Sequence, residues 1–200
     1  MVPITGFDNV LQGDQVRSFV SIDVEDPQTL AQIESAISSL LSLGGDIKAV
    51  GRENIHLTLK FLGNVESSRL SRVKSALSKV EFSPFSAEIK GAGAFPSLSH
   101  MNVVWVGVSE GWSMVQLIYE QTEKFLSEVG FRRESREFSP HITIARVKSA
   151  RHRDEIAGFL RQLEDKSFGS FKVESVRLKQ SVLSSSGPKY STLLKIAPKK

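Results

Sequence analysis

Apolar and polar residues recur along the chain with two different periods, which together predict a mixture of strands and helices. Single-residue alternation predicts a strand, whereas apolar residues three or four positions apart predict a helix. The predicted strands are residues 17–24, 47–50, 55–62, 85–89, 103–108, 141–147, 171–183 (bent or broken) and 190–196, and the predicted helices are residues 27–43, 66–80, 112–129 and 150–163. Strands interleaved with helices predict an α/β or α+β fold.

Breaks in this pattern mark the ends of elements. Asp26-Pro27 is typical of a helix start, and Gly63-Asn64 is expected to end the third strand. A loop containing glycine and proline, residues 90–102, is expected to join two strands. Residues 1–16 lack periodicity, so we expect a flexible N-terminal extension followed by a single domain at residues 17–200.

A tetrapeptide of the form His-x-Thr-x occurs twice, as His56-Leu57-Thr58-Leu59 and as His141-Ile142-Thr143-Ile144. Successive side chains of a strand point to opposite faces, so the His and Thr of each copy share one face. Two such strands side by side would place two imidazoles and two hydroxyls at the floor of one cleft, with helices on the apolar outer faces. We therefore predict an active site at this pair.

These four side chains suit the hydrolysis of a cyclic phosphodiester. Imidazole titrates near neutral pH, so a neutral His can take a proton from water while a protonated His gives one to the departing ribose oxygen. Threonine hydroxyls can donate hydrogen bonds to the non-bridging phosphate oxygens and stabilise the charge that develops there. The arrangement requires no metal ion and no cofactor, and it leaves open which histidine is the acid.

Histidines on strands also serve structural and metal-binding roles. A single His-x-Thr on a strand is usually structural, although two copies in apolar strands are less easily accidental. A zinc site would be expected to add a third ligand at suitable spacing, and neither motif strand carries one. The remaining histidines, His100 and His152, are expected at the surface.

Composition narrows the class of protein. The sequence has no cysteine, and no apolar run approaches the roughly 18 residues of a membrane span. The N-terminal residues show no export or organelle signal, so we expect a cytoplasmic protein without a membrane partner. The net charge of +4 slightly favours a polyanionic partner such as RNA.

The two motifs and their flanks resemble the two-histidine (2H) phosphoesterase superfamily, most closely its RNA 2′,3′-cyclic phosphodiesterase branch, also called 2′-5′ RNA ligases. The matching stretches, in family order, are residues 17–23 (RSFVSID), 53–63 (ENIHLTLKFLG), 93–96 (GAFP), 104–108 (VWVGV), 136–146 (REFSPHITIAR) and Tyr190.

The resemblance implies an α+β fold with two pseudo-symmetric β-sheet lobes, helices on the outer faces and a central cleft. It implies hydrolysis of 2′,3′-cyclic phosphate ends of RNA to 2′-phosphate ends, and a reversible 2′-5′ ligation of tRNA halves. It makes His56 and His141 the catalytic pair and Thr58 and Thr143 the phosphate ligands. We expect a monomer.

Five further residues are candidate substrate contacts. Arg146 stands near the end of the second motif strand, where it could reach the same phosphate. Phe95 could stack on a base, or pack on the core as a loop residue. Arg132 and Arg136 belong to an Arg-rich segment that could contact the RNA backbone or form a solvated loop, and Tyr190 is a candidate RNA contact.

Two other functions remain as alternatives. One is a related cyclic phosphodiesterase that acts on a small nucleotide. The other is an RNA-binding module that keeps the cleft without turnover. The presence of His and Thr in both motifs favours an enzyme over the silent module.

Overall fold

All the strands of the computed structural model pair antiparallel along one path, in the order β7-β4-β5-β6-β3-β1-β8-β9, and β2 pairs with β6. The structure describes residues 14–185 and 187–199. The strands are β1 (Gln15–Asp23), β2 (Ile47–Ala49), β3 (His56–Glu66), β4 (Phe85–Phe95), β5 (Val103–Val108), β6 (His141–Val147), β7 (Ser167–Val173), β8 (Val176–Ser184) and β9 (Gly187–Ile196). The helices are α1 (Pro27–Ser42), α2 (Leu70–Leu77), α3 (Trp112–Glu128) and α4 (Arg153–Gln162).

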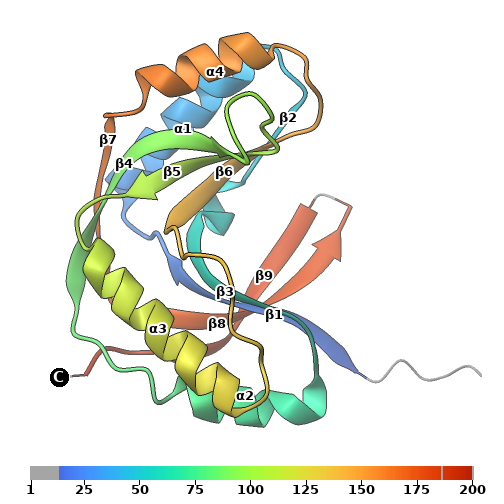
Figure 1. Cartoon of the computed structure of the whole chain (residues 1–200), viewed down its shortest axis with the longest axis vertical. Coiled ribbons are helices and arrows are strands. Elements are labelled where there is room, and N and C mark those ends of the chain that lie inside the picture. The colour runs from blue at the N-terminus through green and yellow to red at the C-terminus, as the bar shows by residue number, and fades with distance from the viewer. Residues whose placement is uncertain (1–13, 186, 200) are drawn as a thin grey trace, which may run out of the picture.

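The sheet narrows between β3 and β6, and this seam divides the fold into two lobes. Among the described residues, the ladder between these strands is a single pair, Leu57 with Ile142. One lobe contains β7, β4, β5, β6 and β2, and the other contains β3, β1, β8 and β9. In Figure 1 the first lobe lies mainly in the upper half of the view and the second in the lower half.

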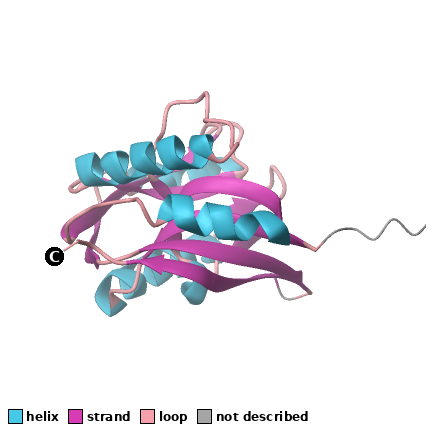
Figure 2. Ribbon diagram, turned by 90° about the horizontal axis from the view of Figure 1, so that it is seen from below, coloured by secondary structure: helices cyan, strands magenta, loops and turns pink. Residues whose placement is uncertain are grey.

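Two helices cover each lobe, and two of the four helices cross from one lobe to the other. α1 follows β1 directly yet packs on β7, β2 and β6, while α3 follows β5 directly yet packs on β3. α4 packs on β4, and α2 packs on α3. Figure 2 shows helices on either side of the strands. The predicted α+β fold with two sheet lobes and outer helices is confirmed.

α1 shows how local sequence sets these elements. The carboxylate of Asp26 accepts a hydrogen bond from the backbone N–H of Thr29 at 2.7 Å, and Pro27 occupies the first helical position. The apolar residues recur on one stripe, which is buried against the sheet. The buried apolar residues of this stripe are Leu30, Ile33, Ala36, Ile37 and Leu40.

Two strands continue past the glycines at which they were expected to end. β3 continues past Gly63, which takes a φ of +68° and stays paired with Ser18. β4 continues past Gly91, which takes a φ of +76° at an irregularity of the β4–β5 ladder. The loop predicted over residues 90–102 is therefore wrong for its first part, because glycine at a bulge bends a strand without ending it.

The remaining differences lie at the ends of elements. The helix predicted at residues 66–80 is shorter, because a 3₁₀ turn at Ser67–Arg69 precedes α2. The segment predicted as bent or broken is indeed two strands, β7 and β8. Of the predicted N-terminal extension, residues 1–13 lie outside the described residues, and β1 begins at Gln15. None of the helices within the described ranges is long and apolar enough to cross a membrane.

Leu57 is expected to be essential to stability, because the seam is so narrow. Its side chain is fully buried, as is that of Ile142 opposite. Leu57→Ala is expected to lower the free energy of unfolding by about 2–5 kcal/mol, through lost burial and the cavity left behind. Chemical denaturation would measure this change.

The matched control is Leu183→Ala, because Leu183 also lies in a strand but is 70% exposed. Its unfolding free energy should change by less than about 0.5 kcal/mol. Equal effects of the two substitutions would contradict the role given to the seam.

Candidate active site

The seam brings the two His-x-Thr-x motifs side by side. Leu57 pairs with Ile142 in an antiparallel ladder, so His56 and Thr143 lie on one side of this pair along the strands, and Thr58 and the second motif histidine, His141, lie on the other. The two apolar residues are fully buried, whereas the His and Thr side chains are half-buried on the other face. Each histidine thus lies on the same side of the Leu57–Ile142 pair as the threonine of the other motif.

Both imidazoles are held by the same kind of local hydrogen bond. Nδ1 of His56 lies 2.6 Å from the carbonyl oxygen of Asn54, and Nδ1 of His141 lies 2.8 Å from that of Ser139. A carbonyl oxygen can only accept, so Nδ1 carries the proton and donates it. In the neutral form of each ring, Nε2 is then the unprotonated nitrogen, which suits it to accept a proton from a reactant.

A β-bulge follows each motif at the same place. In the pairing of β3 with β1 and of β6 with β5, one residue directly after the threonine has no partner. This extra residue moves the side chains that follow it to the opposite face of the sheet. The extra residues are Leu59 in β3 (pairs Ser21–Thr58 and Val20–Lys60) and Ile144 in β6 (pairs Trp105–Thr143 and Val104–Ala145).

The bulges determine which later side chains lie on the motif face, that is, the face of the sheet that carries the His and Thr side chains of both motifs. Strict alternation would place Lys60 and Ala145 beside the threonines, but both are buried on the other side. Phe61 and Arg146 take the motif face instead. Phe61 is 68% exposed, and Arg146 is also exposed. Arg146 therefore lies on the motif face because of the bulge, which sequence alternation could not show.

Arg146 stands in a positively charged part of this face. Lys48 is its register partner on β2, so the two side chains share a face. Burial raises the pKa of the Tyr190 hydroxyl, while the positive charges of Arg146 and Arg17 act in the opposite direction. Arg146, which belongs to one lobe, is thus within electrostatic reach of Tyr190 in the other.

Aromatic rings flank each histidine. On one side, the ring centroids of Phe19 and Tyr190 lie 5.0 Å and 5.4 Å from that of His56. On the other side, Phe95 and Trp105 lie 4.8 Å and 6.5 Å from His141. The structure therefore brings the candidates Tyr190 and Phe95 to the site.

The ring of Trp105 lies over Gly93, where an added Cβ would meet it at 2.4 Å. Glycine is therefore needed at this position, because any side chain there would displace the indole. Sequence reasoning missed Trp105 and Phe19, although both belong to stretches that supported the family resemblance.

A buried charge network borders His56. The carboxylate of Asp23, the register partner of His56, accepts from Lys179 Nζ at 2.8 Å and 3.0 Å and from Arg177 Nη1 at 2.8 Å. Burial is the largest influence on the pKa of His56 and lowers it, while the hydrogen bond to Asn54 raises it. Of the two nearby charges, that of Lys179 lowers the pKa of His56 and that of Asp23 raises it. The neutral imidazole of His56 is therefore favoured.

The structure does not tie Arg132 and Arg136 to the motif residues. Both lie exposed in the segment between α3 and β6. Within residues 14–185 and 187–199, neither guanidinium takes part in a hydrogen bond or an ion pair. Their predicted contact with RNA stays a prediction.

Comparison with known proteins places this chain in a family. Residues 22–105 and 110–190 match the LigT like phosphoesterase family. The chain belongs to this family. An RNA 2′,3′-cyclic phosphodiesterase of Archaeoglobus fulgidus is 40% identical over 178 residues, which cover 89% of this chain and 98% of that protein. One of Aeropyrum pernix is 39% identical over 158 residues, which cover 79% of this chain and 90% of that protein.

The fold also matches a solved structure. E. coli LigT complexed with 3′-AMP superposes with a TM-score of 0.74 at 21% identity, covering 94% of this chain and 100% of that chain. The two family segments contain both motifs. The first includes His56 and Thr58, and the second includes His141, Thr143 and Arg146.

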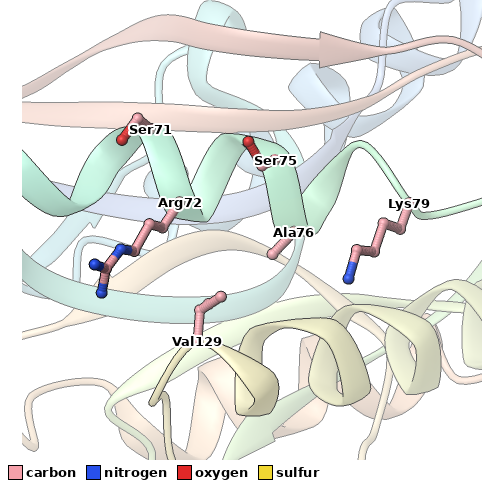
Figure 3. Close-up of a pocket in the computed structure, with 6 residues that line it drawn as sticks. All are labelled: Ser71, Arg72, Ser75, Ala76, Lys79 and Val129. Atoms are coloured by element: carbon pink, nitrogen blue, oxygen red, sulfur yellow. The ribbon is translucent and has the colours of Figure 1, made fainter.

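Other features of the domain do not share the chemistry of the motif residues. A depression of about 260 Å³ opens between α2 and α3, and it contains none of the predicted site residues (Figure 3). Residues 107–111 have the Gly-x-Ser-x-Gly spacing of a serine nucleophile, but Ser109 Oγ donates to the Glu88 carboxylate at 2.6 Å rather than to a histidine. Among the described residues, no three His, Cys, Asp or Glu side chains group so that they could hold a metal ion.

Lys179→Met is expected to raise the pKa of His56. The substitution removes a positive charge that disfavours the imidazolium, and it leaves the Asp23 carboxylate less neutralised, so both changes favour the protonated ring. An NMR titration of the His56 ring protons would measure the shift. Lys172→Met, which removes a lysine on β7 in the other lobe, should leave the titration unchanged. An unchanged or lowered pKa in Lys179→Met would show that the network does not act on His56.

Proposed function

We propose that this chain hydrolyses 2′,3′-cyclic phosphate ends of RNA to 2′-phosphate ends. One observation carries the proposal: the Leu57–Ile142 pair joins the two motif strands, and both motif imidazoles on these strands have a fixed Nδ1–H group. The names of the two archaeal relatives, both RNA 2′,3′-cyclic phosphodiesterases, support the choice of substrate. An enzyme is thereby preferred over a silent RNA-binding module.

The proposed reaction is an acid/base displacement at phosphorus. A neutral imidazole takes a proton from water as the water oxygen bonds to phosphorus, and the bond to the ribose 3′ oxygen breaks. The second imidazole, protonated, gives its proton to that oxygen. Thr58 and Thr143 donate hydrogen bonds to the non-bridging oxygens, and Arg146 supplies a positive charge on the same face. The same steps, with the 5′ hydroxyl of another RNA in place of water, form a 2′-5′ linkage, which is ligation, and their reversal cleaves that linkage.

His56 is assigned the role of base in ring opening, and His141 that of acid. The assignment rests on the surroundings of the His56 ring. Burial among Phe19 and Tyr190, with Lys179 close by, lowers the pKa of His56 and favours the neutral form that a base requires.

The proposed partners and setting follow from the same site. RNA ends that carry a 2′,3′-cyclic phosphate or a 2′-phosphate are the substrate and product, and tRNA halves are one source of them. Phe95 and Tyr190 would contact bases or riboses on the two sides of the phosphate, because each ring adjoins one of the histidines. We expect a cytoplasmic monomer that needs no cofactor.

His56→Ala and His141→Ala are each expected to lower kcat/KM for a 2′,3′-cyclic mononucleotide by roughly 100- to 10,000-fold, the range that acid/base groups contribute. Steady-state rates with 2′,3′-cyclic AMP would measure the loss. Affinity for an RNA that ends in a 2′-phosphate should change little, because the Thr and Arg groups remain.

The matched controls are His100→Ala and His152→Ala. Both side chains lie away from the motif strands, the first in the β4–β5 connection and the second just before α4. These variants should turn over substrate like the wild type. Normal turnover by both motif variants would rule out the two-histidine mechanism.

Turnover is expected to persist unchanged in excess EDTA, because the acid, the base and the phosphate ligands are all side chains of the protein. The measurement is the initial rate before and after prolonged incubation with the chelator. A rate that falls to background and returns only when a divalent cation is added would contradict this mechanism.

A further inference from the structure

A buried ion pair lies beneath the segment that leads into the second motif. Lys60, turned inward by the first bulge, places Nζ 2.5 Å from a carboxylate oxygen of Glu123 on α3. Only 3% of the Lys60 side chain and 7% of the Glu123 side chain are exposed. Such a pair contributes little to stability compared with apolar residues of similar size, because both charges must leave water. Its geometry is therefore the more informative feature.

The remaining hydrogen-bonding capacity of this pair is directed at one segment. Lys60 Nζ also donates to the backbone carbonyl of Arg132 at 2.9 Å. The second carboxylate oxygen of Glu123 accepts from the backbone N–H of Glu134 at 3.0 Å. The ion pair of Lys60 and Glu123 is thus hydrogen-bonded to the backbone on both sides of Arg133. The side chains of residues 132–134 are all exposed, and among them Arg133 Nε donates to Ser127 Oγ at 3.4 Å.

The same segment is held at both ends. At its start, the guanidinium of Arg69 lies over the ring of Phe131 at 5.3 Å and donates to the carbonyl of Val129 at 3.1 Å. At its end, Phe138 stacks on Tyr119 with ring centroids 4.0 Å apart, three residues before His141. The exposed middle is therefore a fixed loop, and it presents three arginines.

We propose that Lys60 and Glu123 are positioning residues that preform the arginine loop (residues 131–138) for the phosphate backbone of RNA. The inference rests on the proposed RNA substrate and deepens it. A loop already fixed in shape loses less conformational freedom when it binds, so its arginines can hold a polyanion more tightly than the same residues on a mobile loop. The first motif strand would thereby supply a residue that favours RNA binding, Lys60, as well as the histidine His56.

The test compares RNA binding with turnover of a mononucleotide. Lys60→Met keeps the aliphatic stem and removes the charge and the hydrogen bonds. Glu123→Gln keeps the shape but removes the charge and one of the two oxygens that accept hydrogen bonds from Lys60 and Glu134. Each is expected to weaken binding of an RNA oligonucleotide that ends in a 2′-phosphate by roughly 2- to 30-fold. The dependence of binding on salt should also become less steep. kcat and KM for 2′,3′-cyclic AMP should stay within about threefold of the wild type, because a mononucleotide does not reach the loop.

Lys79→Met is the matched control, because it also breaks a Lys–Glu pair with α3, in this case the solvent-exposed pair of Lys79 and Glu128. It should leave RNA binding and turnover unchanged. Hydrogen exchange of the Glu134 amide adds a readout that does not depend on activity, and exchange should accelerate in Lys60→Met and Glu123→Gln but not in Lys79→Met.

The outcomes separate the two proposals. Unchanged RNA affinity in Glu123→Gln, together with faster exchange at Glu134, would overturn the positioning role, as would equal losses for RNA and for the mononucleotide. Failure of the wild type to hydrolyse 2′,3′-cyclic AMP would instead contradict the proposed function, and the binding comparison would still test the loop. Lys60→Met is not needed for this decision if it fails to fold, because Glu123→Gln is close to isosteric.

Discussion

The architecture of this protein depends on the packing of Leu57 against Ile142. This one ladder pair joins two lobes that are otherwise complete sheets, and both side chains are fully buried. An apolar pair at this point fixes the register, because a shift by one residue would turn every motif side chain to the other face. The positions of all four polar motif residues follow from that register.

The parts of the site that could be predicted from sequence are those that depend on neighbours within a strand. His and Thr share a face in each motif because they are two residues apart, and this required no knowledge of the partner strand. The face taken by Arg146 depends on how β6 pairs with β5, so its place could not be read from alternation. The contact of Lys179 with Asp23 joins residues that are 156 positions apart, and nothing local marks it.

For the fold as well, features within one element could be predicted from the sequence, whereas contacts between elements could not. Periodicity identified the helices because a buried stripe repeats within one element, as on α1. Glycine was the less dependable guide, because Gly63 and Gly91 bend strands that continue beyond them. The crossing of α1 and α3 between the lobes is a tertiary feature, set by which sheet faces remain uncovered.

The two bulges occur at the same place after each motif, but the side chains that they bring to the motif face differ. This difference makes the two sides of the site unlike. A pseudo-twofold pair of motifs would present the same surroundings to both sides of a phosphate. At the equivalent place after each motif, however, one lobe carries the cation of Arg146 and the other the uncharged ring of Phe61. An anionic group therefore meets unlike neighbours on its two sides. The doubled motif therefore forms an asymmetric site, in which the two possible orientations of a bound molecule would meet different side chains.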